Sequence, residues 1–325
     1  MKKILVLFGP TATGKTNLAI KLAKEYNGEL ISADSRQVYK NLDIGTGKVS
    51  FDSQVQKHND YWIVDGIKIN GFDLVKAGKQ FTAADFSKFA STSLIRINKA
   101  KKLPIIVGGT GFYIKVLTDG IESIGIAADQ KLRQDLEKLS KDHLYQKLQT
   151  VDKNRAESMN ESDRQNPRRL IRAIEICMHQ AAKNTKYPLR PRSEASKIPD
   201  TEYLIIGLTA PNQFLFDRSD KWLETRLNHG LIKEVNTLIK DKIDLIWMDN
   251  LGLEYRWLSR YLTGKVPKEE AIKRLKGDAH NRIRREKTWF NKFQNIEIFD
   301  ITKSDWQKQL EKMIYSTNGG IKISN

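Results

Sequence analysis

The sequence has almost no cysteine and no long apolar run. Cys177 is the only cysteine among 325 residues, which excludes an internal disulfide and a multi-cysteine zinc site and fits a reducing cytoplasm. No stretch approaches the roughly 18 apolar residues that a membrane-spanning helix needs. We therefore expect a cytoplasmic protein with no membrane role. The helical spacing of Cys177 with Ile174 and Met178 predicts that this thiol lies in a core rather than at a catalytic centre.

Acidic residues are outnumbered by basic ones, and the histidines form no metal-binding pattern. The 56 lysines and arginines exceed the 39 aspartates and glutamates by 17, and such an excess suits a polyanionic partner such as a nucleic acid or an acidic membrane surface. A solvated, lysine-rich surface is the alternative. The five histidines have no metal-ligand spacing, so we assign them no catalytic role. A hydrophobic content of 39% is normal for a globular protein and argues against disorder.

A phosphate-binding loop is the strongest motif that the sequence does contain. GPTATGKT follows the apolar run at 4–8, which we interpret as a buried first strand, and precedes a helical pattern over 17–26. The backbone N–H groups of such a loop face an anion, its lysine adds a positive charge, and its last hydroxyl can bind Mg²⁺. We predict Thr16 as the Mg²⁺ ligand, and the predicted phosphate-binding residues are Gly9, Pro10, Thr11, Ala12, Thr13, Gly14, Lys15 and Thr16.

The acid that usually accompanies a hydrolytic phosphate loop is missing from the later predicted strands. Those strands end as PIIVGGTG and LIIGLTAP, without a carboxylate that would hold Mg²⁺. The nearest acid is Asp34, after the predicted strand GELISA, and it is open to three interpretations: Mg²⁺ partner, general base or helix cap. Ser35, Arg36 and Gln37 suit a base edge as well as a phosphate. Thr110, in GGTG, adds a hydroxyl.

The alternation of strands and helices predicts an α/β fold with a parallel sheet covered by helices on both faces. The segments 9–16, 34–37 and 108–113 each follow a strand, so we expect them to meet at the carboxyl edge of the sheet. Residues 49–79 are irregular and β-like, and Thr82 with Asp85 predicts a helix start. We divide the chain into a core at 1–120, a helical insertion at 121–198 that closes with a loop at 184–200, and a return to the core with C-terminal helices at 199–325.

Two helical segments carry arginines. In QNPRRLIRAIEI, Asn166 is the predicted N-cap of a helix whose basic ridge is formed by Arg168, Arg169 and Arg172, while Leu170, Ile171 and Ile174 face the core. Arginine suits phosphate because its planar fork donates two hydrogen bonds, although a solvated helix face has the same appearance. The second segment, NRIRREKTWF, has a basic face formed by Arg282, Arg284 and Arg285, and we assign its Trp289 and Phe290 to the core.

Taken in order, several motifs resemble those of the tRNA dimethylallyltransferases, also called tRNA isopentenyltransferases. These motifs are GPTATGKT, ISADSRQVYKNLDIGTGK, TAADF, PIIVGGTGFYIKVL, NPRRLIRAIEI, IIGLTAPN, HGLIKEV and TWF. The similarity extends to about residue 293, nearly the whole chain. The resemblance implies a core like that of P-loop nucleotide-binding proteins and a monomeric enzyme.

The resemblance also implies a reaction. With Mg²⁺, the dimethylallyl group of dimethylallyl diphosphate passes to N6 of the adenosine immediately 3′ of the anticodon, in tRNAs reading codons that begin with U. The loop then binds the donor's diphosphate, Asp34 is the general base on the adenine amine, Thr110 assists at the bridging oxygen, and Arg218 steadies the diphosphate. The implied tRNA contacts are Asp34, Ser35, Arg36, Gln37, Thr110, Arg133, Arg168, Arg169, Leu170, Ile171 and Arg172.

The sequence departs from the family pattern at three places. A lone His58 stands where the family usually has a His-His pair, GLEYR (252–256) replaces a segment like GYKE, and RIRRE (282–286) replaces one like YAKRQ. Three alternatives remain: an adenylate isopentenyltransferase, a P-loop small-molecule kinase that consumes ATP, and a non-catalytic RNA-binding protein. The basic charge and the arginine ridge disfavour the first. The intact residues Lys15, Thr16, Asp34 and Thr110 disfavour the last.

Overall fold

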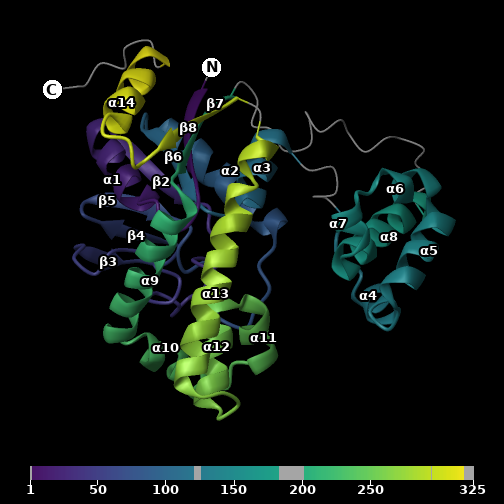
Figure 1. The fold of residues 1–325 in the computed structure, drawn as a ribbon. Coiled ribbons are helices and arrows are strands. Elements are labelled where there is room, and N and C mark those ends of the chain that lie inside the picture. Colours follow the sequence, from purple (N-terminus) through teal and green to yellow (C-terminus); the bar gives the residue numbers. More distant parts are fainter. Residues whose placement is uncertain (1, 121–125, 183–200, 294, 318–325) are drawn as a thin grey trace. The chain divides into compact units, whose positions relative to one another are not determined.

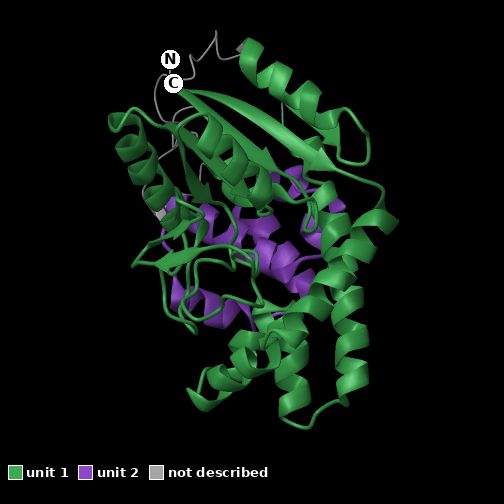
Figure 2. Ribbon diagram, turned by 90° about the vertical axis from the view of Figure 1, so that its left-hand side faces the viewer, with its two compact units in different colours: residues 1–118, 198–325 green, residues 119–197 purple. Residues whose placement is uncertain are grey.

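The computed structural model describes residues 2–120, 126–182, 201–293 and 295–317. The chain forms two compact units (Figure 2): unit 1 contains residues 1–118 and 198–325, and unit 2 contains residues 119–197. The predicted insertion at 121–198 begins and ends on residues outside the described ranges. The predicted loop at 184–200 also lies outside them.

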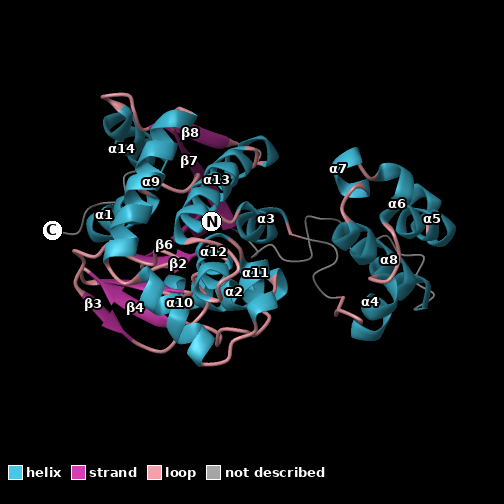
Figure 3. Ribbon diagram, turned by 60° about the horizontal axis from the view of Figure 1, so that its bottom comes forward, coloured by secondary structure: helices cyan, strands magenta, loops and turns pink. Residues whose placement is uncertain are grey.

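Unit 1 is built on an eight-stranded sheet with the order β3-β4-β5-β2-β6-β1-β7-β8 (Figures 1 and 3). The pairs from β5 to β8 are parallel, whereas β3, β4 and β5 pair antiparallel. The predicted parallel sheet is confirmed, and the β-like stretch forms an antiparallel edge. The strands are β1 (Lys2–Phe8), β2 (Gly28–Ser32), β3 (Val55–Lys57), β4 (Tyr61–Val64), β5 (Ile67–Asn70), β6 (Leu103–Gly108), β7 (Thr201–Thr209) and β8 (Ile296–Asp300).

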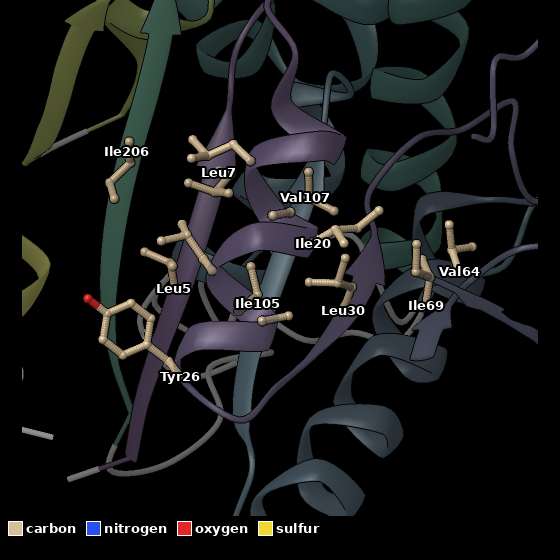
Figure 4. Close-up of a cluster of buried hydrophobic side chains, with 14 of the residues drawn as sticks. Leu5, Leu7, Ile20, Tyr26, Leu30, Val64, Ile69, Ile105, Val107 and Ile206 are labelled. Carbon is tan, nitrogen blue, oxygen red and sulfur yellow. The ribbon is translucent and has the colours of Figure 1, made fainter. Parts of the chain in front are cut away.

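Helices cover both faces of the sheet because its central strands are apolar on both sides. From β1, Leu5 and Leu7 enter the cluster covered by α1 (Lys15–Glu25) and α14 (Trp306–Thr317), and Figure 4 shows them beside Leu30, Ile105, Val107 and Ile206. The alternate β1 residues Ile4, Val6 and Phe8 enter the opposite cluster, with α2 (Ala83–Lys99) and α3 (Gly111–Asp119). The predicted capping box of α2 is present, with Thr82 and Asp85 bonded reciprocally.

Five helices at the C-terminal side form a further core with the loop after β2. They are α9 (Asn212–Asn228), α10 (Leu231–Lys240), α11 (Leu245–Leu251), α12 (Leu253–Leu262) and α13 (Lys268–Lys287). The 20-residue α13 packs on α12 and runs toward α3 (Figure 1). It ends before a 3₁₀ turn, Phe290–Lys292, and Phe290 is buried as predicted. Its last turns therefore reach the sheet.

Unit 2 is helical in its described part, 126–182, where no strand occurs (Figure 3). Its helices are α4 (Gln130–Leu136), α5 (Lys141–Val151), α6 (Lys153–Ser158), α7 (Glu161–Arg164) and α8 (Pro167–Ala182). They pack around a core that includes Leu144, Leu170 and Ile174. Cys177 belongs to this core, as predicted, and burial raises the pKa of its thiol to about 11. In the ranges that the structure describes, no helix is long and apolar enough to cross a membrane.

Candidate active site

The phosphate-binding loop closes tightly on the end of β7. A Cβ atom on Gly9 would lie 2.4 Å from the carbonyl oxygen of Leu208, so this position requires glycine. Gly14 has a left-handed backbone (φ 82°) and directly precedes α1, and Ala12 is also left-handed (φ 71°). The loop thus passes from β1 to the N-terminus of α1, where unpaired backbone N–H groups favour an anion.

Lys15 folds back over its own loop. Its Nζ donates to the carbonyl oxygen of Pro10 at 2.7 Å and lies 3.4 Å from Oγ1 of Thr13. Burial lowers the pKa of Lys15 to about 8, although the negative charges of Glu286 and Asp34 act in the opposite direction. The amine therefore lies in a largely desolvated place beside the loop, where an incoming anion would favour its charged form.

Arg218 and Thr16 lie beside the same loop. Arg218, an exposed residue of α9, places Nη2 3.9 Å from the point where a Cβ atom on Gly14 would stand. Thr16 is half-buried in the first turn of α1. The structure thus brings together the cation and the hydroxyl that the sequence assigned to a diphosphate and to Mg²⁺.

Asp34 and Thr110 meet at the carboxyl edge of the sheet. Asp34 Oδ1 accepts a hydrogen bond from the backbone N–H of Arg36 at 2.9 Å, and the residues that follow form a turn. No helix begins there, so the helix-cap interpretation of Asp34 is wrong: its carboxylate caps a turn. Thr110 Oγ1 accepts from the backbone N–H of Ser35 at 3.0 Å and lies 3.3 Å from the Ser35 hydroxyl. The segments after β2 and β6 are therefore joined directly.

The expectation that the later strands end without an acid holds for β6 and β7 but not for β8, which the sequence reading missed. Asp300 ends β8 and accepts from the backbone N–H and the hydroxyl of Thr302, at 2.9 and 2.7 Å. Those hydrogen bonds lower the pKa of Asp300. This carboxylate closes a turn at an outer strand of the sheet.

Two further charged residues of the site come from α13. Glu286 Oε2 accepts from the backbone N–H and the hydroxyl of Thr11, at 2.7 and 3.0 Å. Arg282 donates from Nε to Glu286 Oε1 at 2.8 Å and places Nη2 3.4 Å from Asp34 Oδ2. Sequence reasoning treated Arg282 as part of a basic helix face and overlooked Glu286. Their spacing of four residues, within a segment that departs from the family pattern, was the available signal.

Two of the residues predicted to read a base edge are engaged inside unit 1. The buried guanidinium of Arg36 pairs with Glu254 of α12, and Arg226 of α9 donates to the same carboxylate at 2.7 Å. Burial alone would raise the pKa of Glu254, but these two arginines outweigh it and lower the pKa to about 2. Gln37 accepts from the Ser32 hydroxyl at 2.6 Å. The Arg36 pair holds the loop after Asp34 against the C-terminal helices, and the Gln37 contact holds it against the end of β2.

In unit 2 the predicted RNA-contacting residues fall into three groups. Arg133 donates to the buried carboxylate of Glu175 at 2.8 and 3.0 Å, and Arg172 pairs with the same group. Leu170 and Ile171 are buried in the core of the unit, as their spacing predicts. Arg168 and Arg169 are exposed on α8. A contact with RNA through a side chain is thus open to the last two, whereas Arg133 and Arg172 also hold the unit together.

A glycine-rich loop between β1 and α1, with Asp34 and Thr110 after the carboxyl ends of β2 and β6, defines the class of P-loop α/β proteins. Within that class the chain belongs to the IPP transferase family, whose model matches residues 37–293. The tRNA dimethylallyltransferase of Acetivibrio thermocellus is 36% identical over 320 residues, which cover 97% of this chain and 96% of the relative. The aligned region therefore extends beyond residues 37–293 and covers nearly the whole chain.

Solved structures give the same result. The full-length tRNA isopentenylpyrophosphate transferase of Bacillus halodurans is 31% identical and has a TM-score of 0.69, with 99% of this chain and 97% of that chain covered. A eukaryotic dimethylallyltransferase, described in crystallographic snapshots as acting on tRNA, is 22% identical with a TM-score of 0.74, covering 100% and 81%. This second likeness shows the shared fold alone.

Proposed function

We propose that the protein transfers the dimethylallyl group from dimethylallyl diphosphate to N6 of the adenosine immediately 3′ of the anticodon, in tRNAs reading codons that begin with U. The observation that carries the proposal is the placement of Asp34 and Thr110 together at the sheet edge beside a phosphate loop. The family membership and the nearly full-length likeness to a tRNA dimethylallyltransferase support it. We expect the protein to act as a monomer.

The residues fit an alkyl transfer. The neutral adenine amine is a weak nucleophile, so a positioned carboxylate helps by accepting the N6 proton as the N–C bond forms and the C–O bond to diphosphate breaks. Asp34 is suited to this task, and the hydroxyl of Thr110 would assist at the bridging oxygen. Lys15, the loop N–H groups and Arg218 would take up the charge of the departing diphosphate. The loop would then bind the diphosphate as the leaving group, and the reaction would require no hydrolysis of a phosphate bond.

The donor set also fits Mg²⁺. The hydroxyl of Thr16 is a hard oxygen donor at the N-terminus of α1, and in the described residues no group of three or more acidic, histidine or cysteine side chains could hold a metal alone. Mg²⁺ commonly retains several waters and binds through one or two protein oxygens together with substrate phosphates. Thr16 would hold the ion, which would neutralise part of the diphosphate charge.

The tRNA would contact both units. We propose contacts at Asp34–Gln37 and Thr110 in unit 1, and at Arg133 and Arg168–Arg172 in unit 2. The target base must leave its stack to reach Asp34, and contacts to the tRNA backbone would offset that cost. The exposed Arg168 and Arg169 are the side chains best placed for phosphates.

The test is transfer of label from dimethylallyl diphosphate, in the presence of Mg²⁺, to unmodified tRNA or to AMP. Label in tRNA supports the proposal, and nuclease digestion should place the label on the base 3′ of the anticodon. Label in AMP but not in tRNA would instead identify an adenylate isopentenyltransferase. Consumption of ATP without prenyl transfer would identify a kinase.

A further inference from the structure

Two charged side chains of α13 connect the phosphate loop to Asp34, and the reaction proposed above uses neither. Glu286 accepts two hydrogen bonds from Thr11 and one from Arg282. Arg282 in turn places its Nη2 3.4 Å from Asp34 Oδ2. Only 7% of the Glu286 side chain and 19% of the Arg282 side chain are exposed. One turn of α13 therefore connects the phosphate loop, at Thr11, to the Asp34 carboxylate.

Arg282 has two opposing effects on Asp34. Its N–H group orients the carboxylate, which favours catalysis, but its positive charge attracts the carboxylate electrons with which Asp34 must take up the N6 proton in the transfer. Lys15 in the loop and Tyr113 in α3 also interact electrostatically with Asp34. An uncompensated guanidinium beside Lys15 would make Asp34 a poor base. Glu286 opposes that effect, because its negatively charged carboxylate pairs with the guanidinium of Arg282.

Glu286 alone would be unfavourable for the donor. Its carboxylate lies on the backbone N–H of Thr11, inside the loop that must receive an anionic diphosphate. The negative charge of Glu286 would repel the negative charge of the diphosphate, and the burial of the site would strengthen this repulsion. By pairing with Glu286, Arg282 reduces this repulsion of the diphosphate. Glu286 in turn reduces the effect of the Arg282 charge on Asp34.

We propose that Arg282 and Glu286 are a charge-compensated pair of positioning residues, which fixes Asp34 relative to the phosphate loop while adding no net charge to either; this inference rests on the proposed prenyl transfer. The positive charge of Arg282 and the negative charge of Glu286 cancel within one turn of α13, where Arg282 Nε donates to Glu286 Oε1 at 2.8 Å.

The experiment compares the wild-type protein with R282Y, E286Q and the double variant R282Y/E286Q, in label transfer to tRNA. In E286Q the charge of Arg282 beside Asp34 is uncompensated, so kcat should fall roughly threefold, while KM for the donor should not rise. In R282Y the carboxylate of Glu286 is uncompensated, so KM for the donor should rise about tenfold. The double variant should return to within about threefold of wild type in both respects.

The matched control is the pair Glu270 and Arg274, which lies on the same helix with the same spacing. These side chains are 40% and 55% exposed and paired at 2.7 Å. E270Q and R274Y should leave kcat and KM unchanged. Thermal unfolding of every variant separates loss of fold from loss of function. The proposal is overturned if the losses of R282Y and E286Q multiply in the double variant, or if E286Q keeps the wild-type kcat.

Failure of the proposed function can be recognised separately. If the wild-type protein transfers no label, the prenyl transfer is wrong, and the pair is judged by the affinity of a monoalkyl diphosphate in calorimetry. About tenfold weaker binding to R282Y, with recovery in R282Y/E286Q, would support the pair. Equal affinities in the wild-type protein and R282Y would overturn it.

Discussion

At the scale of single residues, Asp34 is the group on which the proposed chemistry depends. Asparagine keeps the Oδ1 acceptor for the Arg36 N–H but cannot take a proton. Asp34→Asn should therefore lower the single-turnover rate of transfer by about 10²–10⁴-fold, while tRNA affinity in a filter-binding assay stays within a few fold. Asp300→Asn is the matched control, because Asp300 closes a turn at β8 and should retain the wild-type rate. Full activity of Asp34→Asn would remove Asp34 as the base.

Cys177 allows a prediction about reactivity. Burial raises the pKa of its thiol to about 11, and the nearby Asp152 acts in the same direction. Because the thiolate is the reactive form, alkylation by iodoacetamide at pH 8 should be much slower in the native protein than in denaturant. The measurement is the mass shift against time under both conditions. Equally fast labelling in the native protein would place Cys177 outside the core of unit 2.

At the scale of elements, the buried Glu254 joins α12 to α9 and to the loop after β2. Arg36 and Arg226 both pair with its carboxylate, so removal of the negative charge leaves two buried cations uncompensated. Glu254→Gln should lower the free energy of unfolding by about 3–5 kcal/mol, measured by urea denaturation. The control, Glu311→Gln, breaks a pair with Lys21 whose side chains are 40% and 54% exposed, and it should cost under about 1 kcal/mol.

The same carboxylate sets a pH dependence. The pKa of Glu254 is lowered to about 2 from its ordinary value of 4.5, so the folded state holds the proton less tightly than the unfolded chain. Its contribution to stability is present above pH 4.5 and is lost as the pH falls toward 2. The free energy of unfolding should therefore fall less steeply with acid in Glu254→Gln than in the wild-type protein. Parallel curves would show that Glu254 is not the group that titrates.

Several elements with clear local signals were predicted correctly, but one strand without periodicity and one helix with it were not identified. The apolar run of β1 and the capping box at Thr82 are local signals, whereas β8 has charged residues at both Glu297 and Asp300 and lies at the edge of the sheet. The helix α14 was not singled out, although Trp306, Leu310, Met313 and Ile314 are spaced i, i+4, i+7 and i+8 and pack in one cluster. Short or mostly exposed elements depend on tertiary packing that the local sequence does not encode.

The residues of the candidate site can also be divided into those that the sequence predicted and those that it did not. The loop, Asp34 and Thr110 are close to strand ends, so motif and topology together predicted their meeting. Glu286 reaches Thr11 across 275 residues of chain, and Glu254 reaches Arg36 across 218. Such partners follow from the packing of α12 and α13 against the sheet edge, and no spacing rule within one segment could have identified them.

At the scale of the whole molecule, the net charge of +17 predicts binding to tRNA that weakens steeply with salt. Arg168 and Arg169 are the exposed arginines of the predicted ridge. Each phosphate contact contributes about 0.7–0.9 to the slope of log K against log salt. Replacing both arginines by glutamine should therefore reduce the slope by about 1.4–1.8, with no change in the affinity for a monoalkyl diphosphate, because unit 1 alone supplies the phosphate loop.

Lys138→Gln with Lys153→Gln is the matched control for that slope. Both lysines are exposed in unit 2 and pair with acidic neighbours, at 3.0 and 3.9 Å, as Arg169 does with Asp163. The control removes the same number of positive charges from the same unit, so a general effect of net charge would change both slopes equally. A reduction confined to the arginine variant would locate the tRNA backbone on α8. Equal reductions would show that the charge of the unit acts only as a diffuse field.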